Sequence, residues 1–194
     1  VPDGDTGTNM SLTIQTAVNE LKKSEPATVG EAAKITAGAL LRGARGNSGV
    51  ILSLLFRGLS KSVKGLTDMD GAQLAAAMAE GVTTAYGAVM KPAEGTVLTV
   101  SRLAAARAVE AAQENPSAEY VLEQAIAAGY ETLAQTIDMN PVLKKAGVVD
   151  AGGKGYLIIL DGMLRALRGE ALPQVEEDGE KDQDKADFGA LSLE

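Results

Sequence analysis

Residues 43–63 read Gly-Ala-Arg-Gly-Asn-Ser-Gly-Val-Ile-Leu-Ser-Leu-Leu-Phe-Arg-Gly-Leu-Ser-Lys-Ser-Val, and this stretch combines two features that decide the fold. A loop with three glycines runs directly into a strongly apolar segment. The apolar residues recur at the three- and four-residue spacing of one helix face: Val50, Ile51, Leu54, Leu55 and Leu59. The stretch therefore predicts a buried helix over about 48–63 that is entered through a glycine-rich turn.

The same pattern, a polar turn followed by an amphipathic helix, repeats on both sides of this stretch. We expect helices over about 9–23, 28–42, 48–63, 71–89, 98–113, 118–137, 141–145 and 154–168. The chain holds 32 alanines, and alanine is the strongest helix former. The expected fold class is all-α, an antiparallel eight-helix bundle or barrel. The apolar residues lie in one-sided stripes, which the core is expected to consume.

Charge divides the chain into two parts. The 194 residues carry a net charge of −8, and residues 174–194 hold eight acids and two lysines, a net of −6. We expect a folded domain over 1–170 and an acidic, disordered linker over 171–194 that leads toward a further domain. The start of the chain, inside a loop-like motif, indicates that residues precede it.

Composition excludes several classes of function. The chain has no Cys and no His, which removes disulfides, Cys- or His-based zinc sites and His-dependent catalysis. Any metal has to sit on oxygen ligands, which favours Mg²⁺, Mn²⁺ or Ca²⁺. The sequence has no basic patch with aromatic residues, the feature that would predict nucleic-acid binding. It also has no run of about 18 apolar residues, which would predict a membrane span. A cytoplasmic location is consistent with the lack of Cys.

The most informative motif is Asp3-Gly-Asp-Thr-Gly-Thr-Asn9, just before the first expected helix. Gly4 lets the backbone bend so that the carboxylates of Asp3 and Asp5 can face one ion. A Mg²⁺ ion would relieve their mutual repulsion, and the helix start would add amide donors for an anion. The alternative interpretation is an Asx-turn that caps the helix.

Three further segments precede expected helices in the same way. The loop over 43–49 could hold a phosphate through its backbone amides, or it could be an interhelical turn. Weaker signals of the same kind lie at 94–96 and 150–155. If alternate helix ends point the same way, these loops converge at one rim of the bundle.

Four motifs in this order resemble the Dak2 (DhaL-type) nucleotide-binding domain over about residues 1–170, and within it most of all the N-terminal domain of the bacterial fatty acid kinase A subunit. They are Pro2–Met10, Arg45–Gly49, Glu94–Thr96 and Val149–Gly155. The resemblance implies an eight-helix antiparallel barrel that holds ADP or ATP and two Mg²⁺ ions at one rim.

The resemblance also implies roles for individual residues. Asp3 and Asp5 match the metal-binding and catalytic aspartates, and Thr6 and Asn9 lie next to the phosphates in the same motif. The second phosphate loop corresponds to Gly46, Asn47, Ser48 and Gly49. The base or ribose is approached by Thr96, Asp150, Ala151 and Gly152. The dihydroxyacetone kinase branch usually has His where this chain has Thr6. A further family metal ligand lies upstream of Asp3, outside this chain.

The function implied is that of the ATP-binding domain of a fatty acid kinase. Such an enzyme phosphorylates the carboxylate of a fatty acid held by a separate DegV-type binding protein, giving acyl phosphate and ADP. Further domains of the full chain and a second copy of the chain are additional candidate partners, and this domain alone is expected to be inactive. The rivals are a dihydroxyacetone-type kinase subunit and a helical nucleotide-binding module that is not an enzyme.

Overall fold

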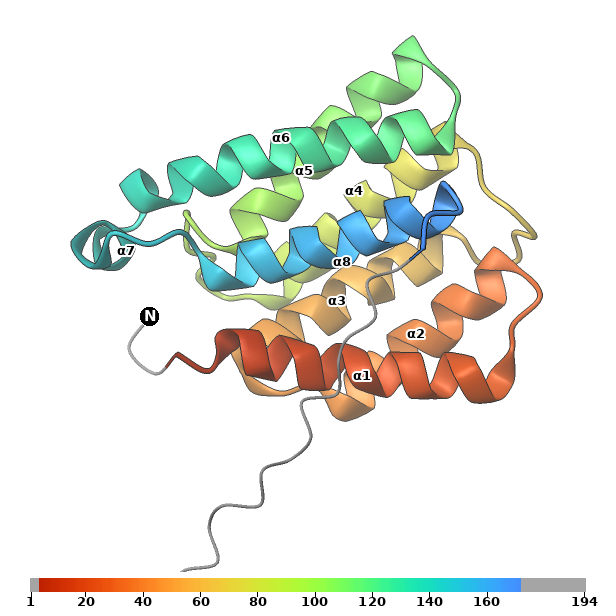
Figure 1. The fold of residues 1–194 in the computed structure, drawn as a ribbon, viewed down its shortest axis with the longest axis horizontal. Helices are drawn as coiled ribbons and strands as arrows, with labels where there is room; N and C mark the ends of the chain where they lie inside the picture. Colours follow the sequence, from red (N-terminus) through yellow and green to blue (C-terminus); the bar gives the residue numbers. More distant parts are fainter. Residues whose placement is uncertain (1–3, 172–194) are drawn as a thin grey trace, which may run out of the picture.

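Residues 4–171, the part of the chain that the computed structural model describes, form eight helices and no strand (Figure 1). The helices are α1 (Thr6–Ser24), α2 (Val29–Gly43), α3 (Gly46–Ser62), α4 (Gly71–Ala88), α5 (Val97–Glu114), α6 (Ala118–Met139), α7 (Pro141–Ala146) and α8 (Ala151–Leu167). The predicted all-α class is confirmed. Asp3 and most of the predicted acidic linker lie outside the described residues.

The seven longer helices close into a ring. Each packs against the next along the chain from α1 to α6, and α8 packs against both α6 and α1. In Figure 1, α1, α3, α5 and α8 run one way and α2, α4 and α6 run the other. Because the number of long helices is odd, one neighbouring pair has to be parallel, and that pair is α8 and α1. The predicted antiparallel barrel is confirmed, with this one parallel seam.

Small residues let the backbones of neighbouring helices touch. A Cβ atom on Gly81 of α4 would lie 2.5 Å from the carbonyl oxygen of Leu55 on α3. Gly58 of α3 meets the Glu80 carbonyl of α4 just as closely. Alanines add to this effect, since Ala77, Ala85, Ala104 and Ala108 are all fully buried. The alanine-rich composition thus gives a tight barrel as well as stable helices.

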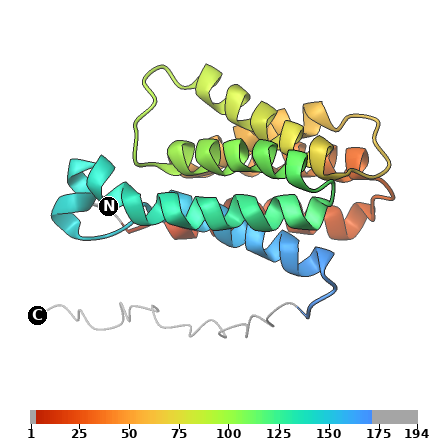
Figure 2. The same cartoon turned by 90° about the horizontal axis from the view of Figure 1, so that it is seen from above.

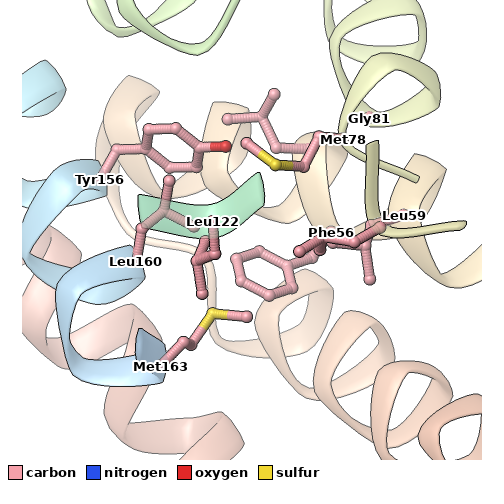
Figure 3. A pocket seen from close by; sticks show the side chains of 10 residues that line it. Phe56, Leu59, Met78, Gly81, Leu122, Tyr156, Leu160 and Met163 are labelled. Carbon is pink, nitrogen blue, oxygen red and sulfur yellow. The ribbon is translucent and has the colours of Figure 1, made fainter. Parts of the chain in front are cut away.

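A small cavity of ≈ 20 Å³ lies in the barrel interior between α3, α4, α6 and α8 (Figure 3). Such a volume is about that of a single water site. The ring of Tyr156 forms part of the wall, and its hydroxyl points toward Met78. Tyr156 is only 5 % exposed, and this burial raises the pKa of its phenol.

An apolar groove of ≈ 510 Å³ remains open between α1, α2 and α8. Its walls include Ile14, Val18, Leu21, Ile158 and Met163. The prediction that the core buries every apolar stripe is therefore wrong on this side, because side chains such as Ile158, 56 % exposed, have no further helix to cover them within residues 4–171.

Within residues 4–171, no helix combines the length and apolarity needed to cross a bilayer.

Candidate functional site

Four helices begin at one end of the barrel, beside α7. They are α1, α3, α5 and α8, at the left of Figure 1, and Figure 2 shows α7 at the same end. Contacts join these starts to one another. The Arg45 amide, before α3, donates to Thr13 Oγ1 of α1 at 3.0 Å, and a Cβ atom on Gly152 of α8 would lie 3.5 Å from Val97 Cβ of α5. The convergence that the sequence predicts conditionally is present.

At the start of α1, the carboxylate of Asp5 does not cap the helix within the described residues. Gly4 has φ +63°, and Asp5 is the N-cap residue, but its side chain makes no capping hydrogen bond among the described residues. Asp5 is exposed, and Thr6 and Asn9, on the first turns of the helix, are half-buried. For Asp5, the interpretation as an Asx-type cap is therefore wrong, and within residues 4–171 no hydrogen bond engages its carboxylate.

The start of α3 lies directly against α1. Only Ala44 and Arg45 separate α2 from α3, so the predicted seven-residue loop over 43–49 is wrong in extent. Gly46 has φ +62°, and a Cβ atom there would lie 2.7 Å from Asn9 Nδ2. The lack of a side chain at Gly46 lets the helix begin several residues earlier than its apolar stripe does.

Asn47, Ser48 and Gly49 consequently form the first turn of α3. Asn47 is exposed, Ser48 is half-buried, and Gly49 is buried. A Cβ on Gly49 would lie 2.5 Å from Thr13 Oγ1, so this glycine sets the distance between α3 and α1. The predicted phosphate-binding residues are thus brought together with Asn9 by the packing of two helices.

The starts of α5 and α8 use capping side chains. Thr96 Oγ1 accepts from the Leu98 amide at 3.3 Å and donates to the Ala93 carbonyl at 2.8 Å. Asp150 Oδ2 accepts from the Gly153 amide at 2.7 Å. The last helix begins at Ala151, three residues before the predicted start near 154, because Asp150 caps it and Gly152 and Gly153 are buried within its first turn.

Asp150 is held in a partly buried environment. Desolvation raises the pKa of its carboxyl group, while hydrogen bonds from the backbone of Gly153 and Val97 act in the opposite direction. Its carboxylate therefore caps α8 through the Gly153 amide. Contact of Asp150, Ala151, Gly152 or Thr96 with a base or ribose stays a prediction.

The long helices of the barrel are not all capped alike. At the opposite end, α2, α4 and α6 have side-chain caps from Thr28, Asp70 and Ser117, which accept from amides of their own first turns. At the candidate site, neither α1 nor α3 has such a cap among the described residues. Unpaired first-turn amides are the groups that bind phosphate at helix starts, so α1 and α3 suit an anion best.

Three buried threonines behind these helix starts were missed by the sequence analysis. Thr13, Thr99 and Thr136 are each at most 1 % exposed, and each accepts a backbone hydrogen bond from the turn before a helix. A signal for one of them is present in the sequence, since Thr13 interrupts the apolar face formed by Met10, Ala17 and their neighbours.

The acidic residues of the site suit a Mg²⁺ ion that is shared with phosphate oxygens better than a metal ion held by protein side chains alone. Within residues 4–171, no three acidic side chains gather closely enough to hold a metal ion. Protein-bound Mg²⁺ commonly uses one or two carboxylates together with phosphate oxygens and water. Asp5, exposed at the start of α1, offers one such carboxylate, and Asp3 lies outside the described residues.

Comparison with known proteins places this chain in a family. The DAK2 domain model matches residues 1–165, and the chain therefore belongs to the Dak2 family. This family comprises DhaL-type, nucleotide-binding helical domains related to kinases. The helical barrel and its grouped helix starts agree with that membership.

The relatives found in staphylococci are longer than this chain. It is 48 % identical over 172 residues to the uncharacterized protein SH1689 of Staphylococcus haemolyticus, covering 89 % of this chain and 31 % of that protein. It is 44 % identical over 198 residues to the uncharacterized protein SAB1090 of Staphylococcus aureus, covering 100 % of this chain and 36 % of that protein. The chain thus spans about a third of the length of these relatives.

Proposed function

We propose that this chain is the ATP- and Mg²⁺-binding domain of a fatty acid kinase. The full enzyme would transfer the γ-phosphoryl group of ATP to the carboxylate of a fatty acid presented by a DegV-type binding protein, giving acyl phosphate and ADP. The observation that carries the nucleotide part is the pair of helix starts, α1 and α3, that have no side-chain cap among residues 4–171, together with the exposed carboxylate of Asp5. The acceptor and the partner rest on the sequence resemblance.

Asp5, together with Asp3, would hold Mg²⁺ against the nucleotide phosphates. When bound, Mg²⁺ neutralises negative charge on the β- and γ-phosphates. The amides of the first turn of α3, with Ser48 half-buried among them, would orient the same phosphates. Thr6 and Asn9 would contact them from α1, and Asn9 already touches Gly46 across the two helices. The starts of α5 and α8 would hold the ribose or base.

The chain needs no general base for this reaction. A fatty acid carboxylate is already ionised at neutral pH, so catalysis requires alignment and charge stabilisation rather than removal of a proton. The lack of His in the sequence is compatible with such an acceptor. A dihydroxyacetone-type kinase instead needs a domain that binds the triose covalently through His, and this chain has none to supply.

Isothermal titration with ATP tests the nucleotide part of the proposal. We expect saturable binding in Mg²⁺ that is lost in excess EDTA. Titration of adenosine in the same buffer is the control, since it lacks phosphates and should be insensitive to Mg²⁺. Equal ATP binding with and without Mg²⁺ would overturn the assignment of the metal. Failure of ATP to bind in Mg²⁺ would overturn the nucleotide-binding function itself.

A further inference from the structure

Three fully buried threonines lie behind the helix starts of the candidate site. Thr13 belongs to α1, Thr99 to α5 and Thr136 to α6, and each accepts a hydrogen bond from a backbone amide in the turn before α3, α5 or α8. We propose that these threonines are positioning residues that fix the three helix starts for the phosphates and sugar of the nucleotide. This inference rests on the proposed function for the identity of the ligand.

Two of the hydrogen bonds join elements far apart in the sequence. The Arg45 amide donates to Thr13 Oγ1 at 3.0 Å, and the Asp150 amide donates to Thr136 Oγ1 at 3.1 Å. The threonine hydroxyls themselves donate to carbonyls of their own helices, at Asn9 and Leu133. Each hydroxyl is therefore satisfied on both sides and oriented before any ligand arrives.

Thr99 forms the third such contact and connects it to a side-chain network. Its Oγ1 accepts from the Gly95 amide at 3.0 Å and donates to Glu94 Oε2 at 2.8 Å. Arg102 donates to the same carboxylate oxygen at 3.0 Å and to the Tyr86 hydroxyl at 3.1 Å. The turn before α5 is thus fixed from within the barrel wall.

The amides of Arg45, Gly95 and Asp150 need an acceptor outside their own helices because each lies at or just before a helix start. Arg45 and Asp150 are N-cap residues, and Gly95 precedes the N-cap residue Thr96, so helix geometry gives none of their amides a partner. A buried amide without an acceptor is costly. Fixing the amide also fixes the direction of the following amides, which are the ones that face an anion.

The same molecule supplies a matched control. Thr132 of α6 is also buried, at 4 % exposed, but its hydroxyl donates only to the Ala128 carbonyl of its own helix among the described residues. Thr132→Val removes a buried hydroxyl of the same size and type without freeing any helix-start amide. It therefore reports the general effect of such a substitution.

The first test uses the unaltered chain and amide hydrogen exchange measured by NMR. The amides of Arg45, Gly95 and Asp150 should exchange slowly, as amides with buried acceptors do, although they lie outside the helical hydrogen-bond ladders. Exchange as fast as that of an exposed turn amide would overturn the proposal. This measurement depends neither on ATP nor on the folding of a variant.

The second test compares Thr13→Val, Thr99→Val and Thr136→Val with Thr132→Val. Each of the first three should speed exchange at its own partner amide and raise the dissociation constant for Mg-ATP about tenfold, because one buried amide loses its acceptor. Thr→Ser at the same positions keeps the hydroxyl and should restore both properties. Thr132→Val should change neither, even where its thermal stability falls equally.

The outcomes separate this inference from the proposed function. If the unaltered chain fails to bind Mg-ATP, the proposed function falls, and the exchange data alone decide whether the threonines fix the helix starts. If Mg-ATP binds and the three Val variants bind it as well as Thr132→Val does, the positioning role is wrong. Failure of Ser to restore binding would likewise overturn it.

Discussion

On the proposed function, single residues at the starts of α1 and α3 set how well this end of the barrel holds phosphate. Asp5 occupies an N-cap position yet makes no capping hydrogen bond within the described residues. Ser48 lies in the first turn of α3, where amides are unpaired. Among the described residues neither side chain caps its own helix, and the proposed role of each in ligand binding leads to a prediction.

Asp5→Asn should weaken Mg²⁺-dependent ATP binding about tenfold or more, because residues behind metal ligands already contribute about 10–100-fold. Asp3→Ala and Asp5→Ala should abolish the Mg²⁺ dependence while helix content, measured by circular dichroism, stays the same. Asp68→Asn is the matched control, since Asp68 is an exposed aspartate in the turn before α4, at the other end of the barrel. Unchanged ATP affinity in the Asp5 variants would remove the metal from this site.

Ser48→Leu should weaken ATP about 10–100-fold, as expected for loss of hydrogen bonds to a charged group, and should leave adenosine binding unchanged. The reason is that a bulky apolar side chain blocks the first-turn amides from the phosphates only. Ser60→Leu, at a half-buried position near the far end of α3, is the control. Equal losses for ATP and adenosine would show that this turn merely connects two helices.

At the scale of helices, stability depends on where glycine replaces a larger residue. Gly58 and Gly81 lie where the backbones of α3 and α4 touch, whereas a Cβ atom on Gly162 of α8 would meet no neighbouring atom within 4 Å. Helix propensity alone would favour alanine at all three positions. Close packing reverses that preference only where a neighbouring backbone occupies the space of the new methyl group.

Gly81→Ala should lower the free energy of unfolding by about 1–3 kcal/mol through overpacking. Gly162→Ala should raise it by about 0.5–1 kcal/mol, because the unfolded chain loses freedom at no steric cost. Urea denaturation of the two variants beside the unaltered chain measures both changes. Stabilisation by Gly81→Ala would mean that α3 and α4 are not in backbone contact.

At the scale of the whole molecule, the apolar groove and the candidate phosphate site lie at different positions along α1. The groove between α1, α2 and α8 runs past Ile14 and Leu21, whereas the candidate site begins at Asp5. At 1.5 Å per residue, Ile14 is about 13 Å along α1 from Asp5, and Leu21 about 24 Å. The groove therefore does not place an apolar ligand at the helix starts by itself.

We predict that this chain binds ATP but does not phosphorylate free fatty acid at a useful rate. Holding two reactants in line contributes up to about 7–11 kcal/mol of barrier lowering, and the chain spans about a third of its relatives. The measurement is acyl phosphate formation from ATP, Mg²⁺ and fatty acid, with and without a DegV-type partner. Full turnover without the partner would make this domain a self-sufficient kinase.

The sequence by itself determined the number, order and approximate limits of the helices. Apolar spacing and caps such as Asp70 act within a few residues, so a local pattern predicts them well. The sequence also placed the four Dak2 motifs at or just before the starts of predicted helices. The starts of α3 and α8 were predicted too late, because Gly46, Gly49, Gly152 and Gly153 look like loop residues until the neighbour that needs their small size is known.

Only the tertiary structure decided how the helix starts are held together. The hydrogen bonds from Arg45 to Thr13 and from Asp150 to Thr136 join residues that no local pattern connects. The parallel contact of α8 with α1 follows from closing an odd number of long helices into a ring, and the open groove lies beside that contact. Periodicity specifies which face of a helix is buried, but the choice of the neighbour that buries it depends on the packing of the whole chain.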